Sequence, residues 1–359
     1  MPSEEDSISF EKSSMTLDSS EIETDNDSES DPNGTKDFIV TPWEVEGDID
    51  YSKLIEKFGT RAIDDTLIEK IKNFTGEIHP FLKNRYFFSH RDLDVVLDEY
   101  RRGNKFYLYT GRGPSGLVHL GHLMPWLFTK YLQEKFNVDL IFQLTDDEKF
   151  LFNSNLDMET IQKYTYENIL DIISIGFDPK RTKVIVDTKH IKYLYPLSIE
   201  IAKKITYSTA KAVFGFSNSS NIGMIGFPPV QGAPCFLPSI IENKPTPVLI
   251  PAFAIDQDPY WRVTRDVAEK LGYPKPAQIH SKFIPGLTSL GKNVILKARN
   301  CIIYCGRARD PRDKNQKYLL PGSTNSSPPT QIRWKCQYLS SILVSKLSLR
   351  YRKGISREV

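Results

Sequence analysis

The chain has 359 residues, of which 40% are hydrophobic, and its 47 Lys and Arg nearly balance its 45 Asp and Glu. This length is enough for one large core or two modest domains. No run of about 18 apolar residues occurs, and the acidic start lacks the regions of a signal peptide, so we expect a cytoplasmic protein without a membrane span. The four cysteines lack the spacing of a disulfide framework or of metal ligands, and no metal site is predicted.

The charge is distributed unevenly along the chain. From Lys292 to the C-terminus there are 15 Lys and Arg against 3 Asp and Glu, and a basic end of this kind is typical of nucleic-acid binding. Residues 1–36 are rich in Ser, Asp and Glu and poor in aromatic side chains. Such a segment cannot bury enough apolar area to offset its ordering entropy, so we expect a disordered acidic leader.

The next segments predict short strands and helices in chain order. Residues 37–47 are rich in Val, Ile and Phe and indicate a strand with Trp43 as an anchor. Helical periodicity follows in residues 51–58 and 64–74, and a further helix is expected over 86–100 after a cap at Ser89.

Strands and helices then alternate. Strands are expected at residues 105–109, 139–144, 183–187 and 248–250, and helices at 119–136, 158–175 and 197–206. This alternation predicts an α/β fold built on a doubly wound parallel sheet, with ligands at the carboxyl ends of the strands. Gln231 falls between these elements, in a proline-containing stretch that we expect to be a loop.

A nucleotide site is predicted where the strand at 105–109 ends. A glycine-rich turn, Thr110-Gly-Arg-Gly-Pro-Ser-Gly116, precedes His119-Leu-Gly-His122 at the start of a helix. Small residues let the backbone approach a phosphate, and the first N–H groups of a helix attract it. His119 and His122 lie on one side of the first turn, although a structural histidine pair would show the same spacing.

Two later blocks give this motif a context. They are Gln143-Leu-Thr-Asp-Asp-Glu148-Lys149 and Ala254-Ile-Asp256-Gln257-Asp258. Together with the histidine motif, and in this order, they resemble the class I aminoacyl-tRNA synthetases, and most of all the tryptophanyl-tRNA synthetases of the archaeal and eukaryotic cytosolic type. The resemblance covers roughly residues 37–290. It implies a Rossmann-like catalytic domain over 86–292, after an N-terminal extension over 37–85.

The resemblance also implies the partners: tryptophan, ATP with Mg²⁺, and tRNA(Trp), in a homodimer. His119, His122 and Lys292 are the implied catalytic residues. The ATP-binding positions that match the family are Gly111, Arg112, Gly113, His119, Gly121, His122, Lys149 and Asp256. Arg112 and Lys149 could equally be surface ion-pair partners, and Asp256 a helix cap.

Tryptophan selection is implied by a second group of matched residues. Tyr109 and Gln143 match the family residues that bond the indole N–H, and Glu148, Gln231 and Gln257 match those that hold the ammonium and carboxylate. An unpaired buried acceptor would disfavour phenylalanine by about 1–3 kcal/mol. Packing between neighbouring strands is the plain alternative for Tyr109 and Gln143.

The resemblance breaks after residue 292. The family expects a mobile Lys-Met-Ser-x-Ser loop there, whereas this chain continues Lys292-Asn-Val-Ile-Leu-Lys297. Codons exist for which a one-base shift restores Lys-Met-Ser-Ser-Ser at this point and a Gly-Gly-Asn segment further on. We therefore expect residues 293–359 to be a frameshifted tail, in place of the helical anticodon-binding domain. A genuine tRNA-gripping tail is the alternative.

Three other interpretations of the whole chain remain at this point. A non-catalytic, synthetase-like protein that binds tryptophan or ATP is favoured by the missing loop. Tyrosyl-tRNA synthetases share the fold and the chemistry, but they are disfavoured by Gln143 and the Thr145-Asp-Asp-Glu148 segment. Another nucleotidyltransferase with paired histidines would leave the amino-acid pocket unexplained.

Overall fold

The computed structural model describes residues 39–40, 45–46 and 50–283. The predicted leader, Lys292 and the predicted tail lie outside the described residues. Among the described helices, none is both long enough and apolar enough to cross a membrane.

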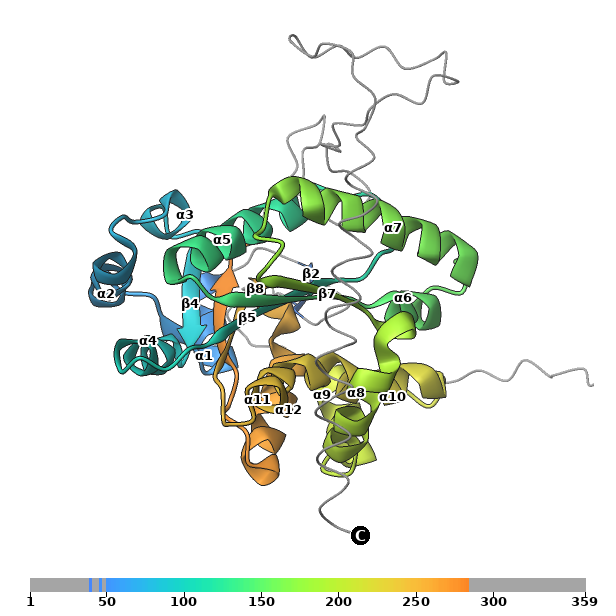
Figure 1. Ribbon diagram of the computed structural model, residues 1–359. Helices are drawn as coiled ribbons and strands as arrows, with labels where there is room; N and C mark the ends of the chain where they lie inside the picture. The colour runs from blue at the N-terminus through green and yellow to red at the C-terminus, as the bar shows by residue number, and fades with distance from the viewer. Residues whose placement is uncertain (1–38, 41–44, 47–49, 284–359) are drawn as a thin grey trace, which may run out of the picture. The chain divides into compact units, whose positions relative to one another are not determined.

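A sheet of seven strands lies at the centre of the described fold, in the order β3-β4-β9-β8-β5-β6-β7 (Figure 1). Strands β9, β8, β5, β6 and β7 run parallel, while β4 is antiparallel to both of its neighbours. The bounds are β3 (Arg61–Ala62), β4 (Phe87–Arg91), β5 (Tyr107–Arg112), β6 (Asp139–Leu144), β7 (Thr182–Val186), β8 (Val248–Ala254) and β9 (Ala277–Ser281). A separate antiparallel pair joins β1 (Ile39–Val40) and β2 (Val45–Glu46).

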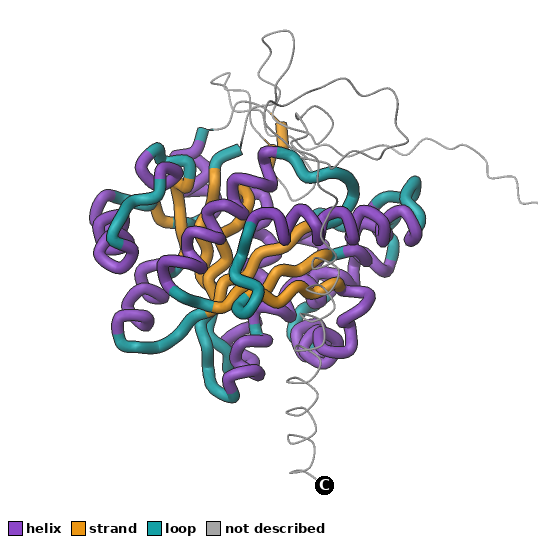
Figure 2. The backbone as a smooth tube through the Cα atoms, turned by 45° about the horizontal axis from the view of Figure 1, so that its top comes forward, coloured by secondary structure: helices purple, strands orange, loops and turns teal. Residues whose placement is uncertain are grey.

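Helices cover both faces of the sheet (Figure 2). One face packs against α2 (Asp65–Thr75), α3 (Pro80–Lys83), α4 (Leu93–Arg101), α5 (Leu120–Phe136) and α7 (Met158–Ile175). The other packs against α8 (Asp187–Ala202), α9 (Tyr207–Phe214), α10 (Ile222–Gly232), α11 (Leu237–Glu242) and α12 (Asp258–Ala268). The remaining helical segments are α1 (Tyr51–Phe58), α6 (Asp146–Phe152), η1 (Ala233–Cys235), η2 (Ile255–Gln257) and η3 (Glu269–Leu271).

Successive side chains of a strand point to opposite faces, and the central strands follow this rule. Leu108 of β5 and Phe142 of β6 enter the core under α5, whereas Tyr109 and Ile141 enter the core under α8 and α10. Because both faces are covered, these strands carry apolar residues on both sides. The predicted doubly wound α/β fold is confirmed.

The chain changes direction within the sheet at β5. It runs from β5 outward through β6 to β7, then returns to β8 on the other side of β5. The carboxyl ends of β5 and β8 therefore flank a topological switch point, where ligands bind in sheets of this type.

Three local predictions were wrong. The helix expected over 86–100 is strand β4 followed by α4, and Ser89 faces His280 across the sheet, with 3.0 Å between Oγ and Nδ1. Helix α8 begins at Asp187, ten residues early, because the interior Pro196 does not end it. Gln231 lies in α10 and not in a loop. Asn221 caps that helix by accepting the Met224 N–H at 2.9 Å.

Candidate active site

The glycine-rich turn is held by a buried arginine at the end of β5. The Arg112 guanidinium donates to the carbonyl oxygens of Gly116 at 3.0 Å and Leu117 at 3.1 Å, and to Oδ1 of Asn168. Only 7% of Arg112 is exposed, so the alternative of a surface ion pair is wrong for this residue. Its contacts fix the path of the turn toward α5.

The two histidines lie together at the start of α5. His119 caps the helix, and its backbone N–H donates to Nδ1 of His122 at 3.4 Å, with 3.7 Å between the ring centroids. A Cβ atom on Gly121 would lie 3.0 Å from Cε1 of His119, so the glycine leaves room for this ring.

Both rings are neutral at pH 7. Burial and the neighbouring Arg112 guanidinium lower the pKa of His119 to about 4. Burial lowers the pKa of His122 well below its usual value, and the charges of Arg112 and Lys149 add to the effect. Neutral imidazoles each carry one N–H donor and one acceptor. The buried Nδ1 of His119 has no hydrogen-bond partner among the described residues.

Lys149 and Glu148 form a pair beside this turn. Nζ of Lys149 lies 2.7 Å from Oε1 of Glu148, whose other oxygen accepts from the Thr145 hydroxyl at 3.0 Å. The aliphatic stem of Lys149 packs so closely on Gly113 that a Cβ there would lie 2.0 Å from its Cε. Gly111 is similarly close to the neighbouring strand, since its Cβ would lie 2.9 Å from the Gln143 carbonyl oxygen.

Three of the five predicted amino-acid residues meet on the other face of the sheet, while Glu148 pairs with Lys149 and Gln257 with Asp256. The Tyr109 hydroxyl donates to Oε1 of Gln143 and accepts from Nε2 of Gln231 at 3.0 Å. Tyr109 is 1% exposed and Gln143 fully buried. The Trp261 ring stands edge-on to Tyr109, with 5.4 Å between centroids. These contacts join β5, β6, α10 and α12 into one polar group with apolar walls.

Three acidic residues that were not predicted adjoin this group. Both carboxylate oxygens of Asp187 lie 2.9 Å from Nε2 of Gln143. Burial raises the pKa of Asp187 well above its usual value and that of Asp147 to about 6. Asp146 accepts from Thr188 at the start of α8. The signal that could have found Asp187 is its place directly after a buried parallel strand.

The last predicted pair follows β8. Asp256 and Gln257 lie in η2, where Nε2 of Gln257 donates to Oδ2 of Asp256 at 3.0 Å. Oδ1 of Asp256 has no partner among the described residues, and burial raises the pKa of this carboxyl to about 6. Lys292 lies outside the described residues.

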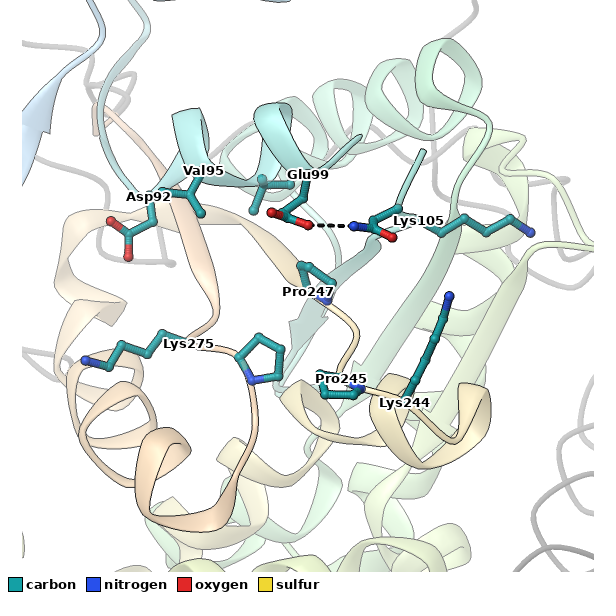
Figure 3. A pocket seen from close by; sticks show the side chains of 11 residues that line it. Asp92, Val95, Glu99, Lys105, Lys244, Pro245, Pro247 and Lys275 are labelled. Atoms are coloured by element: carbon teal, nitrogen blue, oxygen red, sulfur yellow. Dashed lines mark hydrogen bonds between the residues drawn. The ribbon is translucent and has the colours of Figure 1, made fainter. Parts of the chain in front are cut away.

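A pocket of about 430 Å³ lies at the opposite end of the sheet, beside the residues that precede β5 and β8 (Figure 3). Its lining includes Glu99, Lys105, Lys244, Pro247 and Lys275, and none of the predicted site residues. This pocket is therefore separate from the residues predicted for the site. No group of three or more His, Cys, Asp or Glu among the described residues could hold a metal ion.

Comparison with known proteins first defines the class. The family model described as tRNA synthetases class I (W and Y) matches residues 101–220. That stretch holds the glycine-rich turn, both histidines and the strands β5, β6 and β7, so fold, site and family model agree on a class I aminoacyl-tRNA synthetase domain.

Individual relatives then define the family. The chain is 53% identical over 289 residues to the tryptophan–tRNA ligase of Pyrococcus abyssi, covering 80% of this chain and 73% of that protein. The crystal structure of tryptophanyl-tRNA synthetase from Plasmodium falciparum matches with a TM-score of 0.64 and 49% identity, over 67% of each chain. A tryptophan-bound synthetase from Encephalitozoon cuniculi matches at 0.64 and 41%, over 66% of this chain and 70% of that one. The chain belongs to the tryptophan–tRNA ligase family.

Proposed function

We propose that this chain activates tryptophan with ATP and transfers it to tRNA(Trp). The observation that carries the proposal is the buried group formed by Tyr109, Gln143 and Gln231 at the carboxyl end of the parallel sheet. The polar atoms of this group bond one another and Asp187, and the oxygens of Tyr109 and Gln143 keep acceptor capacity for one further donor. An indole N–H is a single donor on an apolar ring and suits this arrangement.

Amino-acid binding tests this proposal. Calorimetric titration should show binding of tryptophan and discrimination against phenylalanine and tyrosine. Tyr109→Phe removes one member of the polar group and should weaken tryptophan binding by about 1–3 kcal/mol. Tyr107→Phe is a matched control, because that hydroxyl bonds Glu242, outside the proposed site, at 2.6 Å. Equal affinity for tyrosine would refute the assignment.

The first reaction joins the amino-acid carboxylate to ATP. One carboxylate oxygen attacks the α-phosphorus, the bond from that phosphorus to the bridging oxygen breaks, and pyrophosphate leaves with the electron pair. The protein's contribution is to position the reactants and stabilise charge on the phosphoryl oxygens. In the proposal, His119 and His122 donate to those oxygens as neutral imidazoles, at the N-terminus of α5 where anions are favoured.

The remaining predicted residues surround this centre. Lys149 is proposed to leave its ion pair with Glu148 and to contact a phosphate of ATP instead. Glu148 is then available for the ammonium group of the amino acid. The unpartnered oxygen of Asp256 supports a role as acceptor for a ribose hydroxyl. Gly111, Gly113 and Gly121 leave room for the Gln143 carbonyl, the Lys149 stem and the His119 ring around the proposed nucleotide site.

Mg²⁺ is proposed to accompany ATP through the nucleotide's own phosphates, where it would neutralise their charge. No group of His, Cys, Asp and Glu side chains in the described part of the chain could hold a metal ion of its own. The homodimer and the cytoplasmic location stay predictions. Light scattering of the purified chain at several concentrations tests the first.

A second candidate function is favoured by one observation: Lys292 is followed by Asn-Val-Ile and not by the expected Met-Ser-x-Ser. A chain that binds both ligands without forming adenylate would act as a tryptophan or ATP sensor. Tryptophan-dependent exchange of pyrophosphate into ATP separates the two functions. Binding without exchange would support the sensor.

A further inference from the structure

We infer that Asp187 is a positioning residue for tryptophan selection, which orients the Gln143 carboxamide so that its oxygen faces the amino-acid pocket. This inference rests on the proposed function and adds the device that makes the pocket an acceptor. It starts from the contact between Asp187 and Gln143 on the sheet face opposite α5.

A carboxamide has two nearly equal shapes, with oxygen and nitrogen exchanged. In one orientation Gln143 offers the pocket an acceptor, and in the other an NH₂ donor that would oppose an indole N–H. Packing alone distinguishes the two orientations poorly, because the groups are almost the same size. The choice must come from what the far side of the carboxamide meets.

Asp187 supplies that choice. Both of its oxygens lie 2.9 Å from Nε2 of Gln143. Asp187 shares a proton with Asp147 in the hydrogen bond between their carboxyl groups. With the proton held there, neither oxygen of Asp187 donates to Gln143. The NH₂ group must therefore face Asp187. The Gln143 oxygen then points to the Tyr109 hydroxyl and the pocket.

The fold holds Asp187 rigidly for this purpose. It is the first residue of α8, directly after β7, and it is fully buried. The next residue is also fixed, because Oδ1 of Asp146 accepts the backbone N–H of Thr188 at 3.0 Å. A buried carboxyl that is fixed in this way makes a reliable reference for the neighbouring amide.

The test uses tryptophan and β-(3-benzothienyl)alanine, in which sulfur replaces the indole N–H. Calorimetry on the wild-type chain should show a preference for tryptophan on the order of 10- to 100-fold, the value of one buried hydrogen bond to a built acceptor. Asp187→Leu removes both acceptors opposite the Gln143 NH₂, so that NH₂ turns toward the Tyr109 hydroxyl and the pocket, and the preference falls at least tenfold. Affinity for the analogue reports on the integrity of the fold.

The double variant D187N/Q143E is the matched control. It exchanges carboxylate and carboxamide between the two positions and keeps the total charge. The carboxylate introduced at position 143 has an oxygen on both sides. It therefore accepts from the amide introduced at position 187 and still offers an acceptor to the pocket, so the preference should return. This variant also serves as the test if Asp187→Leu fails to fold.

Two results would overturn the inference: an unchanged preference in Asp187→Leu, or a lost preference in the double variant while analogue binding persists. Failure of the wild-type chain to bind tryptophan would instead overturn the proposed function.

Discussion

Replacing Arg112 by Met should both destabilise the domain and raise the pKa of His119. The substitution removes the donors to the carbonyls of Gly116 and Leu117 and to Oδ1 of Asn168. Nδ2 of Asn168 continues to donate to the Gly116 carbonyl at 3.0 Å, so two acceptors lose a partner. At about 1–3 kcal/mol for each buried unpaired acceptor, less the relief of burying a charge, we expect a loss of about 2–4 kcal/mol.

Urea unfolding measures this loss as a shift of the midpoint at constant slope. A second readout is the NMR titration of His119. Loss of the Arg112 charge should raise its pKa from about 4, without restoring the usual value, because burial is the larger cause. Arg112→Lys is the control: it keeps the charge but loses the planar fork, so stability should fall while the histidine pKa stays low.

An Arg112→Met chain of unchanged stability, whose only defect is a higher KM for ATP, would contradict this role of Arg112. That outcome would make Arg112 a phosphate ligand, as the family resemblance implied, and not the group that holds the turn.

Three further predictions follow from the proposed site. In a chain with the Lys-Met-Ser-Ser-Ser loop restored, His122→Ala should lower kcat for pyrophosphate exchange by the equivalent of about 2–4 kcal/mol, by analogy with the loss of one oxyanion donor, with little change in the tryptophan KM. An unchanged kcat would leave the ring only its capping role. Asp256→Asn should stabilise the domain above pH 6 by on the order of 1–3 kcal/mol while weakening ATP binding. Asn is expected to stabilise because folding raises the pKa of Asp256 to about 6, so that this carboxyl ionises in the unfolded chain first. The stability of the wild-type chain should therefore fall as pH rises from about 4 to 6. Equal unfolding midpoints of the wild-type chain at pH 5 and pH 7 would contradict this prediction. Removing one base in the codon of Lys292 should restore a Lys-Met-Ser-Ser-Ser loop and recover adenylate formation and tRNA charging together. If the chain as printed instead charges tRNA well, and loses that activity when it is truncated after Lys292, the basic tail is a real tRNA-binding element.

Much of the sheet could be predicted because its strands are buried on both faces. The strand at 139–144 and the helices at 51–58 and 158–175 agree with the structure to the residue. Strand β4 was missed because its apolar residues lie close to the stripe of α4, and a short apolar run does not separate strand from helix. This segment forms a strand because it pairs with β9, which is about 190 residues away along the chain.

The candidate site, like the sheet, could be predicted only in part. Residues in recognisable motifs were identified, and the structure brings Tyr109, Gln143 and Gln231 into direct contact. Asp187 was not identified, because its place directly after a buried strand does not reveal the amide that it faces on the neighbouring strand. Arg112 was identified with a role that its burial does not favour, since sequence gives the type of a side chain but not the direction in which it points.

Strand β5 carries parts of both binding regions in one short run. Tyr109 belongs to the proposed amino-acid pocket, Gly111 lies opposite Gln143, and Arg112 holds the turn that precedes the histidines. Inserting or deleting one residue here would move each following side chain to the other face of the sheet. Such a length change would disable the choice of amino acid and the nucleotide site at once. Evolution of this chain can therefore alter amino-acid selection by substituting single side chains. Insertions and deletions within β5 are not tolerated.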